Sequence, residues 1–220
     1  SKYGNPDSYV VLGNRYEVLD SSVGYDERGI ASWYGPGFDG KRTSSGEIYD
    51  MYKMTAAHKT LPLPTYARVT NLANGKSIVV KINDRGPFHD NRIIDLSYTA
   101  AAKLGMLKKG TALVEVKAIS VGGPPSPDAV VESETPPASL PAAPQIYVQV
   151  GAFAEHDNAQ RMEARLELGA VGPVVVQPAS SGGQRLYRVR IGPLPDVEAV
   201  DRLTERLAQL GIDNPQVIIP

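Results

Sequence analysis

The sequence predicts an all-β barrel followed by a smaller α+β domain. Residues 29–120 contain short strand-like segments between glycine- and proline-rich loops, which is typical of a barrel. Residues 121–144 hold seven prolines among Gly, Ser, Ala and acidic residues, without helical or strand periodicity, and are therefore predicted to be a linker. Residues 145–220 alternate between strand patterns and helix patterns.

The barrel region carries one helix among its strands. The strand-like segments are GIASWYG, YARVTNL, SIVVKIND and ALVEVKAIS. Ser97 is a typical N-cap residue, YTAAAKL has helical character, and Gly105 is a typical helix stop. Residues 1–28 form an N-terminal extension in which SYVVL and RYEVL flank Gly13-Asn14, a pattern that predicts a β-hairpin without an assigned function.

The last 76 residues, 145–220, predict the order β-α-β-β-α-β. QIYVQV alternates like a strand, and the helix that follows has Asp157 as its expected N-cap. PVVVQ and RLYRVRI form a predicted hairpin with its turn at 180–183, a second helix ends at Gly211, and QVII closes the chain as a strand. This order is typical of a ferredoxin-like fold, in which both helices cover one sheet face and the other face is open. The open face is the candidate binding surface.

Composition excludes several classes of function. Lysine plus arginine (23) nearly balances aspartate plus glutamate (24), so the net charge of −1 does not favour binding to nucleic acid or to an anionic membrane. No apolar run approaches the roughly 20 residues of a membrane helix. The absence of cysteine excludes disulfides and thiolate chemistry within this sequence. The start at Ser1-Lys2-Tyr3 lacks the pattern of a signal peptide, so we expect any export signal or lipid anchor to have been removed.

Three ionisable residues of the barrel region have loop-like settings: Glu47, His58 and Asp84. Loops on a rigid scaffold often carry catalytic groups, and glycoside cleavage requires a carboxylic acid and often a second carboxylate. Glu47 and Asp84 can supply that pair, and His58 can orient one of them. From the residues alone, simpler interpretations remain: Asp84 pairs with Arg85 or caps a turn, Glu47 is solvated, and His58 is structural.

Other polar and aromatic residues also have two interpretations. Asp95 is positioned to cap the helix that follows Ser97, and Trp33 and Tyr34 either pack in the core or stack on sugar rings. The three histidines show neither HExxH nor a close cluster with carboxylates, so no metal is predicted. No phosphate-binding loop and no serine-nucleophile motif is present, and no cofactor is expected.

The barrel segments resemble a known family. GIASWYGPGFDGKRTSSGEIYD, MTAAHKTLPLPTYARVTNLANGKSIVVKINDRGPF and RIIDLSYTAAAKLGM together resemble the double-psi β-barrel of the rare lipoprotein A family, over nearly all of residues 29–106. The resemblance implies an outer-membrane lipoprotein and a lytic transglycosylase. Such an enzyme cuts between N-acetylmuramic acid and N-acetylglucosamine and leaves a 1,6-anhydro end. The family's acidic residue, histidine and aspartate match Glu47, His58 and Asp84.

The C-terminal segments YVQVGAF and LYRVRIGPL resemble a SPOR domain. The resemblance implies binding to glycan strands without peptide stems, which gather at division septa. Strand alternation puts Gln149, Arg188 and Arg190 on one side, which we expect to be the open face. The two arginines are equally well explained as ordinary exposed strand residues. Phe153 either lines the binding groove or packs on the following helix.

The resulting hypothesis is an endo-acting lytic transglycosylase in which Asp84 protonates the glycosidic oxygen and then accepts the proton of the C6 hydroxyl. Glu47 either stabilises the developing positive charge or assists with proton transfer, and His58 positions a carboxylate or the substrate. The expected partners are peptide-free glycan strands and division-site proteins. The expected location is the periplasm, at the septum, with membrane contact only through a lipid anchor outside this sequence.

Two rival functions remain at this point. Double-psi barrels also occur in expansin-like proteins, which bind and loosen walls without cutting bonds. RNA-reading domains share the topology of the C-terminal domain. The segment LYRVRIGP lacks the paired aromatic residues on which RNA bases stack, which argues against an RNA reader.

Overall fold

The computed structural model describes residues 3–89, 91–119 and 144–220. The chain divides into two compact units, Ser1–Ala143 and Pro144–Pro220. The predicted linker, 121–144, lies outside the described residues except for Pro144. None of the helices in the described parts of the chain is long and apolar enough to cross a membrane.

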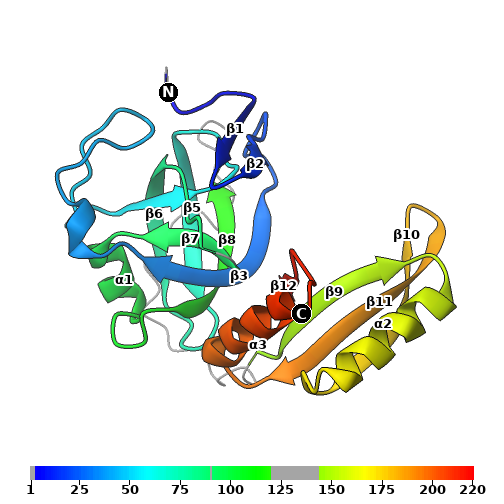
Figure 1. Cartoon of the computed structure of the whole chain (residues 1–220). Helices are drawn as coiled ribbons and strands as arrows, with labels where there is room; N and C mark the ends of the chain where they lie inside the picture. The colour runs from blue at the N-terminus through cyan, green and yellow to red at the C-terminus, as the bar shows by residue number, and fades with distance from the viewer. Residues whose placement is uncertain (1–2, 90, 120–143) are drawn as a thin grey trace. The chain divides into compact units, whose positions relative to one another are not determined.

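The first unit is built around a closed barrel with the strand order β3-β7-β4-β6-β5-β8 (Figure 1). Its strands are β3 (Asp26–Trp33), β4 (Thr55–His58), β5 (Thr65–Asn71), β6 (Ser77–Asp84), β7 (Arg92–Leu96) and β8 (Ala112–Ile119). The pairs β3/β7 and β4/β6 are parallel and the other pairs are antiparallel. The predicted all-β barrel is confirmed, and its first strand begins at Asp26, inside the predicted 1–28 extension.

Alternation along the strands produces the barrel core. In β5, every second residue from Thr65 to Asn71 is buried while the residues between them are partly or fully exposed. Ala67, Val69, Ile82 and Val116 are completely buried in this core. Burial of each Val or Ile side chain contributes roughly 1.5–3 kcal/mol, so the core holds the strand register that positions the outward-facing residues.

The predicted helix of the barrel unit is confirmed as α1 (Tyr98–Leu104). The Ser97 side chain accepts a hydrogen bond from the Ala100 amide, and Gly105 ends the helix in the left-handed conformation with φ 75°. Because Ser97 is the N-cap, the interpretation of Asp95 as the cap of this helix is wrong. A short 3-10 helix, η1 (Pro36–Phe38), was not predicted.

The hairpin in the N-terminal extension is also confirmed. β1 (Ser8–Val11) pairs antiparallel with β2 (Asn14–Glu17). The turn consists of Leu12 and Gly13, whose φ values of 50° and 83° suit a two-residue hairpin turn, and Asn14 already belongs to β2, so the predicted turn at Gly13-Asn14 is displaced by one residue.

The second unit is a four-stranded antiparallel sheet with the order β10-β11-β9-β12 and two helices. Its elements are β9 (Ile146–Phe153), α2 (His156–Leu168), β10 (Val174–Ser181), β11 (Gln184–Leu194), α3 (Val197–Gln209) and β12 (Gln216–Ile218). This arrangement confirms the predicted β-α-β-β-α-β fold.

Two local predictions in this unit are wrong. The N-cap of α2 is Glu155, and Asp157 lies within the first turn, where its charge still favours the helix dipole. The β10–β11 turn consists of Gly182 and Gly183 alone, because both have positive φ and the preceding serines continue β10.

Candidate functional site

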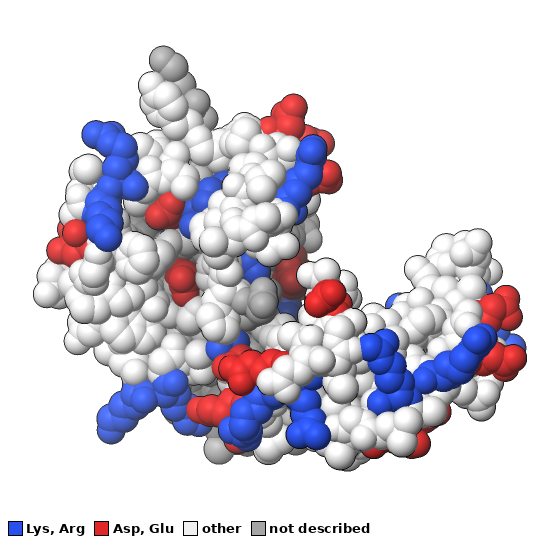
Figure 2. Space-filling model, viewed as in Figure 1, with Lys and Arg blue, Asp and Glu red and all other residues white. Residues whose placement is uncertain are grey.

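Two aspartates flank a small residue on the outer face of the barrel. Ala57 on β4 is paired with Asp84 on β6 and with Asp95 on β7. Paired residues of adjacent strands face the same side, and strands are about 4.8 Å apart, so the two aspartate Cα atoms lie about 10 Å apart across Ala57. Figure 2 shows acidic surface in the hollow of this unit, between the N-terminal hairpin and the loop after β3. The sequence prediction included Asp84 but not its pairing with Asp95.

A β-bulge brings Asp84 into this position. The β4–β6 register changes from Ala56 paired with Ile82 to Ala57 paired with Asp84, so Asn83 is the additional residue. Ala56 and Ile82 are buried in the barrel core, and the bulge turns Asp84 to the outer face on which Ala57 lies. Bulges of this kind often direct side chains at active sites.

One oxygen of Asp84 is held by three donors. Its Oδ1 accepts hydrogen bonds from the Ser44 amide (2.8 Å), the Ser44 hydroxyl (2.7 Å) and the Arg85 amide (2.8 Å). These contacts fix the orientation of the carboxylate.

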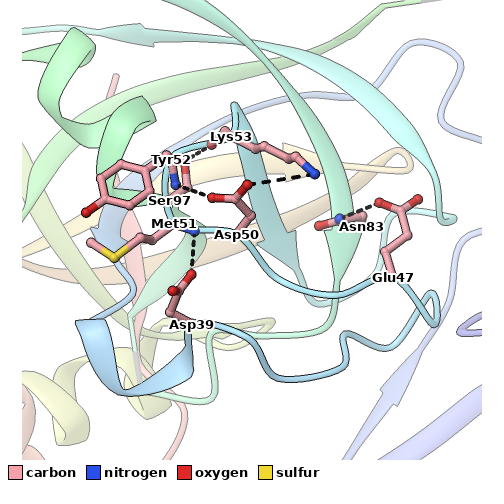
Figure 3. A network of polar contacts seen from close by, with 8 residues as sticks. All are labelled: Asp39, Glu47, Asp50, Met51, Tyr52, Lys53, Asn83 and Ser97. Atoms are coloured by element: carbon pink, nitrogen blue, oxygen red, sulfur yellow. Dashed lines mark hydrogen bonds and ion pairs between the residues drawn. The ribbon is translucent and has the colours of Figure 1, made fainter.

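Glu47 lies near the same end of β6, because its side chain contacts two residues that shortly precede Asp84. Its carboxylate forms an ion pair with Lys81. It also accepts a hydrogen bond of 2.9 Å from the Asn83 side-chain amide (Figure 3). The hydrogen bonds from Lys81 and Asn83 lower the pKa of Glu47, so this carboxylate is ionised at neutral pH. The structure therefore places Glu47 and Asp84 at the same end of β6 and gives Glu47 a cationic side chain, Lys81, as its partner.

The loop that carries Glu47 is fixed by its own polar contacts (Figure 3). Asp39 accepts a hydrogen bond from the Met51 amide (2.9 Å), and Asp50 accepts one from the Tyr52 amide (2.9 Å). The Ser97 hydroxyl, which also caps α1, donates to the Lys53 carbonyl (2.6 Å). A loop held at both ends in this way can keep Ser44 and Glu47 against β6.

His58 has a different environment from the one expected. Its side chain is 3% exposed, Nε2 lies 2.8 Å from the Tyr25 hydroxyl, and Nδ1 accepts hydrogen bonds from the Thr60 and Leu61 amides. Burial, with the positive charges of Arg85 and Lys59, lowers the pKa of His58 to about 3. The ring is therefore neutral. Through its contacts with the Tyr25 hydroxyl and with the Thr60 and Leu61 amides, it shapes the loop after β4. The structure places none of its hydrogen bonds on Glu47 or Asp84.

Asp95 and Tyr34 complete the barrel face. The Ser32 hydroxyl donates to Asp95 Oδ1 (2.5 Å), while burial raises the pKa of Asp95 above its usual range. The Tyr34 hydroxyl is buried next to Asp84, and burial together with the charges of Asp84 and Asp95 raises its pKa. A buried hydroxyl in this position can bond to a carboxylate or to a substrate oxygen.

In the second unit, the predicted polar residues lie on one face of the sheet. Arg190 pairs with Gln149 and donates to its side chain (3.3 Å), and it also donates to Gln177 on β10 (3.2 Å). Gln149 pairs in turn with Gln216 on β12. Residues that alternate with this set are completely buried: Val148, Val189 and Ile191. Gln177 and Gln216 were missed by the sequence prediction because cross-strand register decides which residues join the row.

The two other predicted binding residues differ from each other. Arg188 lies two residues from Arg190 on β11 and therefore faces the same side. Phe153 pairs with Tyr187, which alternates with Arg188, and so faces the side on which the helices pack. Phe153 lines a shallow groove together with residues of α2: Asn158, Arg161, Met162 and Arg165. The structure therefore places Phe153 beside α2 and separates it from the polar row.

Comparisons with known proteins agree with both units. Residues 26–116 match the family described as lytic transglycolase, and residues 142–219 match the SPOR domain family. The crystal structure of the RlpA SPOR domain from Pseudomonas aeruginosa is 32% identical, covers 34% of this chain and 99% of that chain, and superposes with a TM-score of 0.33.

Two relatives match nearly the whole chain. The endolytic peptidoglycan transglycosylase RlpA of Pseudomonas aeruginosa (strain UCBPP-PA14) is 38% identical over 260 residues, covering 96% of this chain and 76% of the relative. The protein of the same name from Vibrio cholerae is 41% identical over 212 residues, with the same two coverages. The chain therefore belongs to the RlpA family, with a double-psi β-barrel followed by a SPOR domain.

Proposed function

We propose that this chain is an endo-acting lytic transglycosylase that cleaves the bond between N-acetylmuramic acid and N-acetylglucosamine in glycan strands lacking stem peptides. By family it is a peptidoglycan lytic transglycosylase. The observation that carries the assignment of the site is the placement of Asp84 and Asp95 on either side of Ala57, with the Tyr34 hydroxyl near both carboxylates.

The reaction includes two proton transfers, and two carboxyl groups can serve as the proton donor and the proton acceptor. As the bond from the anomeric carbon to the glycosidic oxygen breaks, an acid protonates that oxygen. As the C6 hydroxyl oxygen attacks the anomeric carbon, a base accepts its proton and the 1,6-anhydro ring closes. We assign the acid to Asp95, whose burial favours the protonated form, and the base to Asp84. This assignment divides between two residues the steps that the sequence-based hypothesis gave to Asp84 alone, and solvent restores the two protonation states after release.

Glu47 and His58 have supporting roles in this proposal. Glu47 remains ionised, so its charge favours the oxocarbenium-like transition state, and it joins the loop that carries Ser44 to β6. His58 shapes the loop whose Leu61 carbonyl accepts a hydrogen bond of 2.5 Å from Arg85, the residue after Asp84. His58 thus acts on the site through Arg85 and not by contact with a carboxylate.

Product masses test the proposed reaction. The protein is incubated with peptide-free glycan strands, and the soluble fragments are analysed by mass spectrometry. We expect fragments that end in 1,6-anhydro-N-acetylmuramic acid, each lighter by one water than a hydrolysed fragment. Reducing ends would instead identify a hydrolase. Strands that are bound but not cut would support the expansin-like alternative, in which the barrel binds the wall without catalysis.

The SPOR domain is proposed to direct the enzyme to its substrate. A SPOR domain implies peptidoglycan binding, and the family implies a location in the cell envelope. The row of Arg190, Gln149 and Gln177 offers hydrogen-bonding groups on a sheet face, which suits the hydroxyl and amide groups of a glycan. We propose that this face binds peptide-free strands in the periplasm at the division septum, next to division-site proteins, and that a lipid anchor supplies any membrane contact.

Arg190→Ala is expected to weaken binding of the full chain to peptide-free strands by about tenfold, because it removes a charged donor and the ordering of two glutamines. Cosedimentation with the strands measures this effect. Arg202→Ala, which removes an equal charge from an exposed position on α3, is the matched control. Equal binding of both variants would exclude this face as the binding surface.

A further inference from the structure

The N-terminal segment, residues 3–19, is attached to the loops around Asp84. It precedes the part of the chain that matches the transglycolase family, which begins at residue 26. Asn5 forms two hydrogen bonds of 2.7 Å with the Leu63 backbone, the Tyr9 hydroxyl donates to the Lys59 carbonyl (2.7 Å), and the Leu19 amide donates to the Thr60 carbonyl (2.8 Å). The segment is therefore an ordered part of the barrel unit.

Arg85 joins this segment to the site. Its Nε and Nη2 donate to the Gly4 carbonyl (3.0 and 2.6 Å), and Nη2 also donates to Asn5 Oδ1 (3.0 Å). Its Nη1 donates to the Leu61 carbonyl on the loop after β4. Since the Arg85 amide donates to the Asp84 carboxylate, a single residue contacts both the catalytic group and the N-terminal segment.

The segment then runs along the loop that contains Glu47. Gly4 adopts φ +86°, and a Cβ atom there would lie 2.8 Å from the carbonyl oxygen of Ser44, so only glycine fits. One residue earlier, the ring of Tyr3 lies 3.6 Å from the place where a Cβ of Gly46 would be. Tyr3 is 61% exposed. An aromatic ring is thus exposed to solvent beside Gly46, the residue before Glu47.

A second group of aromatic rings lies on the other side of Arg85. The Tyr9 and Tyr16 rings are stacked with centroids 5.3 Å apart, and Phe88 contacts both at 6.3 and 5.7 Å. The Arg85 guanidinium lies over the Tyr9 ring at 5.7 Å. These three rings are half-buried and explain how the hairpin stays attached to the barrel. Tyr3 is more exposed to solvent than any of these three rings.

We propose that residues 3–19 form one wall of the glycan-binding groove, and that Tyr3 is a subsite on which a sugar ring stacks next to the cleaved bond. Pyranose rings have faces of C–H groups, which pack on aromatic rings, while a phenol hydroxyl still meets water or sugar hydroxyls. An enzyme that cuts within a strand must hold sugars on both sides of the bond, and Tyr3 lies beside the Glu47 loop. This inference rests on the proposed function, because it concerns the same groove.

Tryptophan fluorescence tests the subsite without requiring cleavage. Tyr3→Trp is placed in the full chain together with Asp84→Asn, and the emission is followed while soluble peptide-free glycan fragments are added. We expect a saturable change. The matched control is Tyr52→Trp in the same background, because Tyr52 is 68% exposed but its ring contacts Tyr98. The Asp84→Asn protein with native Tyr3 and Tyr52 gives the background signal of Trp33, the one tryptophan of the sequence.

Kinetics provide the second readout. In the otherwise unchanged enzyme, Tyr3→Ala is expected to raise KM by roughly three- to tenfold with little change in kcat, and Tyr3→Phe to retain the native KM, because stacking needs the ring only. An unchanged emission of the Tyr3→Trp protein together with a native KM for Tyr3→Ala would overturn the subsite. Failure of the parent enzyme to release anhydro fragments would instead overturn the proposed function, while a fluorescence response would still support the binding site.

Discussion

Asp84→Asn is expected to reduce the rate of strand cleavage by roughly 10²–10⁴-fold, the contribution of a general acid–base group. An amide cannot accept the proton of the C6 hydroxyl, so the 1,6-anhydro ring cannot close at the native rate. The substitution preserves shape, and the new amide oxygen can still accept the hydrogen bonds that Ser44 and Arg85 now donate to Oδ1. Release of anhydro-ended fragments per unit time, measured by mass spectrometry, checks this expectation.

Binding and stability controls separate chemistry from folding in this variant. The Asp84→Asn protein should cosediment with peptide-free strands as the parent does, and its thermal unfolding midpoint should remain close to that of the parent. Asp26→Asn is a matched control, because Asp26 pairs with Lys117 on β8 and is half-exposed. Cleavage by Asp84→Asn at the rate of Asp26→Asn would show that Asp84 is not the base.

Local signals in the sequence predicted much of the fold. Ser97 and Gly105 mark the ends of α1 because each satisfies backbone groups at its own end of the helix. The alternation around Val189 and Arg190 predicted both the strand and the side of the sheet that each residue faces. Such features depend on residues close together in the chain, so a single sequence is sufficient to identify them.

The arrangement of the site depends on contacts that are distant in the sequence. Asp84 and Asp95 face the same side only because both pair with Ala57, and Asp84 does so only because Asn83 is in a bulge. Neither strand pairing nor a bulge is visible in the local pattern around these residues. His58 shows the same limitation, since its ring packs against Tyr25, a residue 33 positions earlier that lies just before β3.

Asp95→Asn is expected to lower the cleavage rate by roughly 10²–10⁴-fold, because an amide cannot protonate the glycosidic oxygen. Cleavage of the glycosidic bond would then proceed without an acid catalyst, while Asp84 could still accept the C6 hydroxyl proton. The same product assay measures the effect, and native binding to peptide-free strands is the control. A variant that cuts at the parent rate would return both proton transfers to Asp84 alone.

The pH dependence of the rate identifies the protonation state of Asp95. Burial raises the pKa of Asp95, and the hydrogen bond from Ser32 lowers it by stabilising the ionised form. If Asp95 is the acid, activity is present while it is protonated and falls as the pH rises through its pKa. Ser32→Ala removes the hydrogen bond, so the pKa of Asp95 rises further and the alkaline limb of the kcat/KM profile moves to higher pH. An alkaline limb that stays in place would show that Asp95 is not the acid. Movement of the acid limb to higher pH instead would mean that Asp95 acts in its ionised form and that its charge, not its proton, assists the reaction.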